Sequence, residues 1–205
     1  MNIQARHPTT ADEFLRWNEG REGKREFVQG KVVEMMVGVS KYHFVIVSRV
    51  LHQLMARLGV RDYAIGAAEF GVRTVSGIRY PDILVDRIGG GNTLAATEPL
   101  LIGEVLSPSS YTADFGEKVT DYTNVPTLKY YLILSQDEPR AWLWSREEEG
   151  GGWIGARQFA GKDASVPLMA FGFELTLADI YDGLHTPDAY PPPDASSKSD
   201  PVGRS

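Results

Sequence analysis

The stretch that decides the fold runs from Arg79 to Tyr122 and contains RYPDILVD at 79–86, LLIGEVLSPSS at 100–110 and DFGEKVTDY at 114–122. The first two segments are apolar runs of strand length, and each carries one acid, Asp82 or Glu104, where a structural strand would carry an aliphatic residue. The run around Glu104 is apolar almost without interruption, which predicts a central strand covered on both faces.

Two acids in apolar strands indicate a bound cation. A carboxylate in an apolar setting is costly unless its charge is compensated, and two of them on neighbouring strands raise each other's pKa by repulsion. The sequence has no cysteine, and no histidine lies close to either acid along the chain, which favours Mg²⁺ or Mn²⁺ over zinc. We therefore predict that Asp82 and Glu104 hold a divalent metal together. The alternative is that both acids cap strand ends through loop amides.

The segment that follows predicts a helix with a lysine beside its apolar stripe. The stripe consists, at positions i, i+4 and i+7, of Phe115, Val119 and Tyr122. Lys118 lies at its edge, so its ammonium is directed toward the sheet. Beside two metal-bound carboxylates, such a lysine can hold the attacking water or neutralise charge that develops on a phosphate. The alternative is a surface ion pair with Asp114 or Asp121.

Length and composition predict one domain and a tail. The 205 residues are long enough for a substantial core at 1–185, whereas 186–205 is rich in Pro, Ser and Asp and is expected to be disordered. The absence of cysteine excludes disulfides and a thiol nucleophile. No apolar run approaches transmembrane length, so we expect a cytoplasmic protein without a membrane partner. The net charge of -6 argues against strong non-specific attraction to nucleic acid.

The remaining elements predict an α/β or α+β fold with a mixed sheet. A capping box at Thr10 and Glu13 opens a short helix, 24–36 reads as a hairpin, and 42–58 is an amphipathic helix whose stripe begins at Phe44. Strands are predicted at 64–75, 78–86, 129–135, 141–145, 153–159 and from 166, followed by a closing helix or turn within 175–184. His43, at the start of the long helix, is expected to be a packing residue rather than a ligand.

The motifs EFLRW, REFVQGKVVEM, GVRT, YPDILV, IGEVLSPSS, EKVTDY and LKYYLI resemble the Uma family of restriction-endonuclease-like proteins, within the PD-(D/E)xK nuclease superfamily. The resemblance implies a restriction-endonuclease-like mixed sheet flanked by helices, with an N-terminal helix and hairpin, and phosphodiester hydrolysis as the chemistry. In that superfamily the aspartate and glutamate bind magnesium, and a lysine two residues after the glutamate assists the water. Here that position is Leu106, and the resemblance moves the lysine to Lys118. An acid from an earlier element, here Glu26, commonly completes the site.

These inferences lead to three hypotheses. The first is a Mg²⁺-dependent or Mn²⁺-dependent endonuclease acting on nucleic acid, expected to be DNA, and assembling as a homodimer. Asp82 and Glu104 are its metal ligands, the carbonyl of Val105 is a further ligand, Glu26 is a supporting acid and Lys118 steadies the water. The second is an inactive nuclease-fold module that binds or regulates. The third is a hydrolase of small phosphoesters.

Overall fold

The computed structural model describes residues 7–35, 38–67, 69–107, 110–146 and 151–184. The tail predicted at 186–205 lies outside these residues. Within them, no helix is long and apolar enough to cross a membrane.

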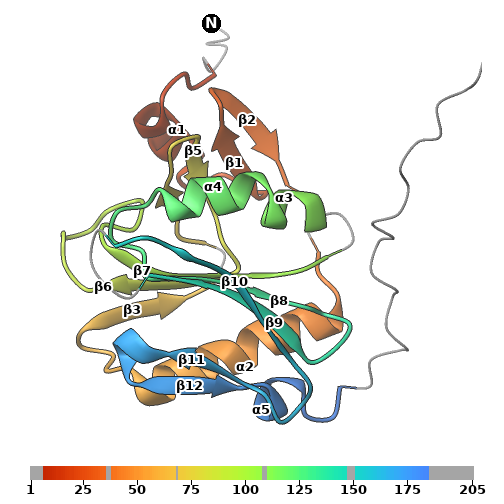
Figure 1. Ribbon diagram of the computed structural model, residues 1–205. Coiled ribbons are helices and arrows are strands. Elements are labelled where there is room, and N and C mark those ends of the chain that lie inside the picture. The colour runs from red at the N-terminus through yellow and green to blue at the C-terminus, as the bar shows by residue number, and fades with distance from the viewer. Residues whose placement is uncertain (1–6, 36–37, 68, 108–109, 147–150, 185–205) are drawn as a thin grey trace, which may run out of the picture.

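A six-stranded sheet forms the centre of the molecule (Figure 1). In spatial order its strands are β10 (Ile154–Ala160), β9 (Arg140–Ser145), β8 (Tyr130–Leu134), β7 (Pro99–Val105), β6 (Ile83–Arg87) and β3 (Tyr63–Gly66). The β7–β8 pair is parallel and the other pairs are antiparallel, so the sheet is mixed. Every residue of β7 is buried, which confirms the predicted central strand covered on both faces.

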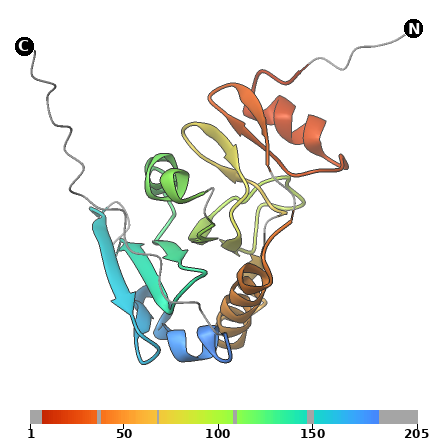
Figure 2. The ribbon, with the colours of Figure 1, turned by 90° about the vertical axis from the view of Figure 1, so that its right-hand side faces the viewer.

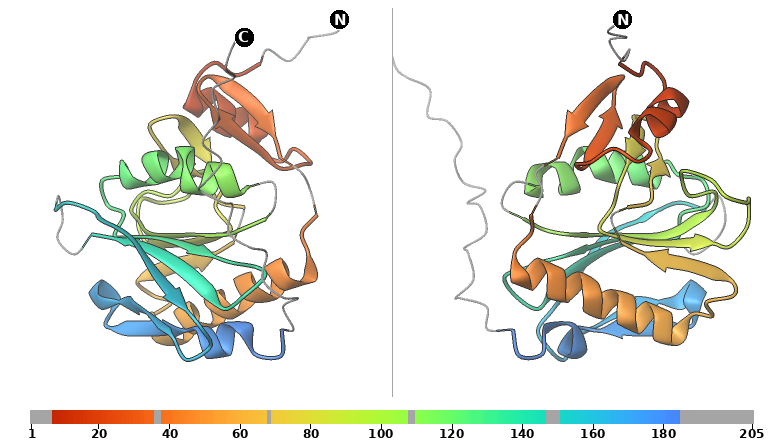
Figure 3. Two further views of the ribbon diagram at one scale, coloured as in Figure 1. Left: turned by 45° about the vertical axis from the view of Figure 1, so that its right-hand side comes forward. Right: turned by 180° about the vertical axis from the view of Figure 1, so that it is seen from behind.

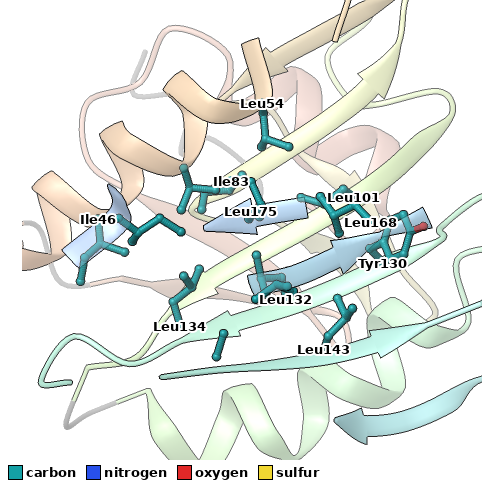
Figure 4. Packing of buried hydrophobic residues seen from close by; sticks show 14 of the residues in the cluster. Ile46, Leu54, Ile83, Leu101, Tyr130, Leu132, Leu134, Leu143, Leu168 and Leu175 are labelled. Carbon is teal, nitrogen blue, oxygen red and sulfur yellow. The ribbon is translucent and has the colours of Figure 1, made fainter. Parts of the chain in front are cut away.

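Helices and a hairpin cover the two faces of this sheet (Figures 1 and 3). One face packs against α2 (Lys41–Arg57), the hairpin β11 (Ser165–Leu168) and β12 (Phe173–Thr176), and α5 (Leu177–Tyr181). Figure 4 shows buried side chains of this core, most of them aliphatic, together with Tyr130. The other face packs against α3 (Tyr111–Phe115) and α4 (Glu117–Thr123), through a second core rich in tyrosine and tryptophan.

A smaller layer lies at the N-terminal end of the chain. It comprises α1 (Ala11–Asn18) and a four-stranded sheet, in the order β2 (Lys31–Glu34), β1 (Arg25–Val28), β5 (Gly77–Arg79) and β4 (Val72–Arg73). The predicted cap of α1 is present, because the Thr10 hydroxyl accepts a hydrogen bond from the amide of Glu13. Figure 2 shows the β4–β5 strands standing between β1–β2 and α4. The small sheet thereby connects the N-terminal elements to the central sheet.

The two strands predicted at 64–75 and 78–86 are each divided between the two sheets. The prediction of one strand at 64–75 is wrong, because β3 belongs to the large sheet and β4 to the small one. The predicted strand at 78–86 likewise separates into β5 and β6. Pro81 lies between them and has no amide to donate to a ladder, which explains the break. Asp82 therefore lies where the chain crosses from one sheet to the other.

Two predicted helices also differ in detail. The helix predicted around Lys118 is divided at Gly116, whose φ of -113° and ψ of -101° are not helical. At the start of α2, the buried face is shifted by about one residue from the predicted stripe. Phe44 is 64% exposed there, whereas His43 and Ile46 are buried. The first turns of α2 are apolar on most sides, so periodicity alone does not identify the face that packs on the sheet.

We expect Gly77→Ala to destabilise the fold. Gly77 has a φ of +147°, and a Cβ atom there would lie 2.0 Å from the carbonyl oxygen of Phe27 on the paired strand β1. Backbone strain and steric overlap together should lower the free energy of unfolding by at least about 2 kcal/mol in urea titrations. Gly155→Ala is the control, since its Cβ would meet no atom within 4 Å. Equal stability of the two variants would contradict this account.

Candidate active site

The pairing of β6 and β7 places Asp82 and Glu104 on the same face of the large sheet. Leu84 pairs with Ile102, and both side chains pack in the core under α4. Asp82 lies two residues before Leu84, and Glu104 lies two residues after Ile102. Because side chains alternate between the faces of a sheet, both acids point toward that same face. The backbone amide of Val105 also donates a hydrogen bond to Asp82 Oδ2 at 3.0 Å.

Glu104 is held by two donors from α4. Its Oε1 atom accepts a hydrogen bond from the Tyr122 hydroxyl at 2.8 Å and lies 3.0 Å from Lys118 Nζ. Burial raises the pKa of Glu104 to about 8. Repulsion from Asp82 and Asp114 also raises this pKa and offsets part of the lowering that Lys118 causes. A further cation nearby would therefore favour the ionised form of Glu104.

Lys118 lies between two buried carboxylates. Besides Glu104, its Nζ atom lies 2.8 Å from Asp114 Oδ1, and Asp114 has no exposed surface. Burial alone would lower the pKa of Lys118, but the attraction of Glu104 and Asp114 raises it above its ordinary value. The ammonium stays charged, and its pairing is internal rather than the surface ion pair considered as an alternative.

Asp82 has the opposite electrostatic setting. Burial would raise its pKa, yet the neighbouring His43, the Val105 amide and Lys24 together hold the pKa below its ordinary value. His43 Nε2 lies 3.4 Å and Lys24 Nζ 3.9 Å from Asp82 Oδ1. The two acids thus differ, with Asp82 ionised readily and Glu104 ionised reluctantly.

Glu26 belongs to an adjoining ionic cluster. Its carboxylate lies 3.0 Å from Arg79 Nη1 and accepts a hydrogen bond from the amide of Tyr80 at 3.1 Å. Arg79 also contacts Asp121 of α4 at 2.7 Å. Glu26 is close enough to raise the pKa of Lys118, but its described contacts are with Arg79 and the Tyr80 amide. It therefore joins the small sheet to α4 beside the carboxylate pair.

The donor set fits a hard divalent cation. Asp82 and Glu104 supply carboxylate oxygens from two neighbouring segments of the sheet. Such a cation would relieve the repulsion between these two carboxylates. Among the described residues no group of three or more His, Cys, Asp or Glu side chains could hold a metal ion. Magnesium is commonly held by one or two carboxylates together with water and substrate phosphates, so a pair is sufficient. Val105 contacts the site through its amide.

Three neighbours of the predicted site residues were not predicted to belong to it. The sequence predicts His43 as a packing residue, Asp114 as a surface partner of Lys118 and Tyr122 as part of an apolar stripe. His43 was missed because it lies on α2, some forty positions before Asp82 in the sequence. Asp114 and Lys118 have the i, i+4 spacing of a helical ion pair, and this signal identifies the contact but not its burial.

Comparison with known proteins identifies relatives of this chain. Two uncharacterized proteins of Synechocystis sp. are each 30% identical to it, one over 177 residues, covering 84% of this chain and 91% of the relative. The other matches over 133 residues, covering 62% of this chain and 75% of the relative. A crystal structure from Anabaena variabilis, described as that of "a putative nuclease", has a TM-score of 0.65 at 20% identity, over 85% of this chain and 98% of that one. This likeness confirms the mixed α+β fold.

A family model also matches residues 11–178, which include both sheets and all the acids described above. The match confirms the resemblance inferred from the motifs, and the chain belongs to the Uma2 family, which is described as "Putative restriction endonuclease".

Proposed function

We propose that this protein is a metal-dependent endonuclease that hydrolyses phosphodiester bonds of nucleic acid, with DNA as the expected substrate and a homodimer as the expected assembly. The observation that carries the proposal is the pair of the half-buried Asp82 and the buried Glu104, on one face of the large sheet, with a charged lysine 3.0 Å from the glutamate. Family membership and the nuclease-like fold support the same chemistry.

The proposed metal is Mg²⁺ or Mn²⁺, held by Asp82 and Glu104 with the carbonyl of Val105 as a further ligand. When bound, such an ion polarises a phosphate and lowers the pKa of a coordinated water. The remaining contributions come from the protein.

Lys118 is the proposed catalytic cation. Its ammonium remains protonated because two carboxylates surround it, so it can donate a hydrogen bond to the attacking water or to the phosphate oxygens as negative charge develops. Asp114 is a positioning residue that holds this ammonium from the other side. Tyr122 is a positioning residue for Glu104, because its hydroxyl fixes the Oε1 atom.

Asp82 is positioned by His43 and by the Val105 amide, which favour its ionised form. Glu26 supports the site through Arg79, whose guanidinium also contacts Asp121 on the helix that carries Lys118. In this scheme Glu26 maintains the distance between the small sheet and α4 rather than contacting the substrate.

We expect Asp82→Asn and Glu104→Gln each to lower metal-dependent cleavage of DNA by at least about a hundredfold, because each removes a negatively charged ligand. The assay follows plasmid and oligonucleotide cleavage with Mg²⁺ and Mn²⁺, and circular dichroism checks folding. Glu34→Gln is the control, since the Glu34 side chain is 80% exposed on β2. Cleavage by either site variant at the parent rate would exclude this mechanism.

Calorimetry with the metals alone distinguishes a nuclease from an inactive nuclease-fold module. A nuclease predicts binding heat that disappears in Asp82→Asn and Glu104→Gln. A module that no longer cleaves and lacks the metal site predicts no such heat in the parent protein. Hydrolysis of a chromogenic diester without any cleavage of polynucleotides would instead favour a small-phosphoester hydrolase.

We expect the metal-free protein to lose stability as pH rises from about 4.5 to about 8. Native Glu104 keeps its proton up to about pH 8, whereas an unfolded glutamate loses it near 4.5, so the native state binds more protons in this window. Each pH unit then lowers the free energy of unfolding by up to about 1.4 kcal/mol. Urea titrations in a chelating buffer measure this slope, and Glu104→Gln should flatten it. An unchanged slope in that variant would contradict the pKa assignment.

We expect Lys118→Met to destabilise the protein by about 3 kcal/mol, because the buried carboxylate of Asp114 is then left without a cation. Adding Asp114→Asn to this variant should restore part of the stability, since one uncompensated charge is removed. Cleavage should remain lost in the double variant, because the proposed catalytic ammonium is absent. Recovery of cleavage together with stability would show that Lys118 has only a structural role.

A further inference from the structure

A pocket of about 680 Å³ is lined by the loop that bears Lys24, a neighbour of Asp82. One wall is the segment from Asn18 to Arg25, which leads from α1 into β1, and the opposite wall includes Thr93 and Leu94. Figure 3 shows the N-terminal layer to which α1 and β1 belong, at one end of the molecule. The pocket lies in a part of the protein to which the proposed metal chemistry assigns no role.

One residue of the pocket lining contacts a proposed metal ligand. Lys24 lines the pocket and places Nζ 3.9 Å from Asp82 Oδ1. Tyr80 also lines it, two residues before Asp82, and its amide is held by Glu26. A molecule in the pocket that contacts Lys24 would therefore lie close to Asp82.

The lining carries cations that suit a phosphate. The pocket is lined by the basic residues Arg21, Lys24 and Arg25 and by the acids Glu19 and Glu69. Arg25 lies 3.5 Å from Glu34, but among the described residues no carboxylate forms an ion pair with Arg21, whose guanidinium stacks on a tryptophan ring. Lys24 pairs with Asp82 and Arg25 with Glu34, so Arg21 is the lining cation whose charge a negatively charged ligand would compensate.

The same pocket also offers flat and apolar surfaces. Phe70 and Tyr80 contribute half-buried aromatic side chains, and Leu94 is 37% exposed at the opposite wall. Aromatic and apolar surfaces combined with cations are the features by which proteins hold single nucleotides without reading their sequence. The volume is in the range of pockets that take one small molecule, about 300 to 1,000 Å³.

We propose that this pocket holds one unpaired nucleotide next to the scissile phosphate, a proposal that rests on the nuclease function proposed above. Its base lies against Phe70, Tyr80 and Leu94, and its phosphate faces Lys24 and Arg21. A base enters a concave pocket only when it has left its stack and its partner. The protein therefore prefers nucleic acid with an unpaired position at the cut, such as a single strand, a flap or a frayed end, over an uninterrupted duplex.

Binding in the absence of metal tests this proposal apart from cleavage. Fluorescence anisotropy of the full chain in a chelating buffer compares a single-stranded oligonucleotide with the duplex of the same length, and 2-aminopurine in the strand reports the change in base stacking. We expect the single strand to bind at least about tenfold more tightly than the duplex. We also expect the aminopurine signal to change on binding.

Two exposed positions give variants that should fold normally. Leu94→Asp places a negative charge against the base and phosphate, and should weaken single-strand binding at least about fivefold and remove the aminopurine signal. Arg21→Ala should weaken binding and lower the salt dependence by about one phosphate contact. Arg57→Ala is the matched control, because it removes one exposed cation at the end of α2, on the opposite face of the large sheet (Figure 1).

The outcomes separate this proposal from the nuclease proposal. Duplex binding as tight as single-strand binding, or Leu94→Asp and Arg21→Ala behaving like Arg57→Ala, overturns the pocket assignment even if the protein cleaves DNA. Single-strand binding that depends on Leu94 and Arg21, in a protein that cleaves no nucleic acid with either metal, supports the pocket and overturns the nuclease function.

Discussion

The structure depends on the compensation of charge beneath α3 and α4. Three carboxylates, Asp82, Glu104 and Asp114, lie on or under the large sheet, and the ammonium of Lys118 lies between two of them. Removing such groups from water costs several kcal/mol for each ion, so they persist only with close partners. Burial raises the pKa of Glu104 to about 8 although the ammonium of Lys118 lowers it, so the compensation by this lysine is partial. An additional cation at this place would complete it.

A second ionic cluster joins this region to the N-terminal layer. Arg79 contacts Glu26 of β1 and Asp121 of α4, so one guanidinium connects both sheets through the helix that carries Lys118. The crossing of the chain at Pro81 brings Asp82 to the same junction. The carboxylate pair, the lysine and the adjoining pocket are therefore products of how the two sheets meet, and none of them belongs to a single supersecondary unit.

Sequence reasoning succeeded where a local pattern determines the result. The apolar run around Glu104 is a buried central strand, and the strand that follows Asp82 pairs with it, as predicted for neighbouring strands. The position of Lys118 beside an apolar stripe correctly directed it toward the sheet. The same reasoning failed for strand limits and for the face of α2, because an extended apolar stretch does not reveal which of two sheets it joins.

The sequence by itself predicted the class of the fold and the two acids and lysine directed toward the sheet, because apolar periodicity and residue spacing are properties of short segments. The family followed from the resemblance of its motifs. Only the tertiary structure decided that His43 faces Asp82 and that Glu26 forms an ion pair with Arg79. It also decided that the loop bearing Lys24, a neighbour of Asp82, lines a pocket. These contacts join residues far apart in the chain. Their formation depends on the packing of two sheets, which no local pattern specifies.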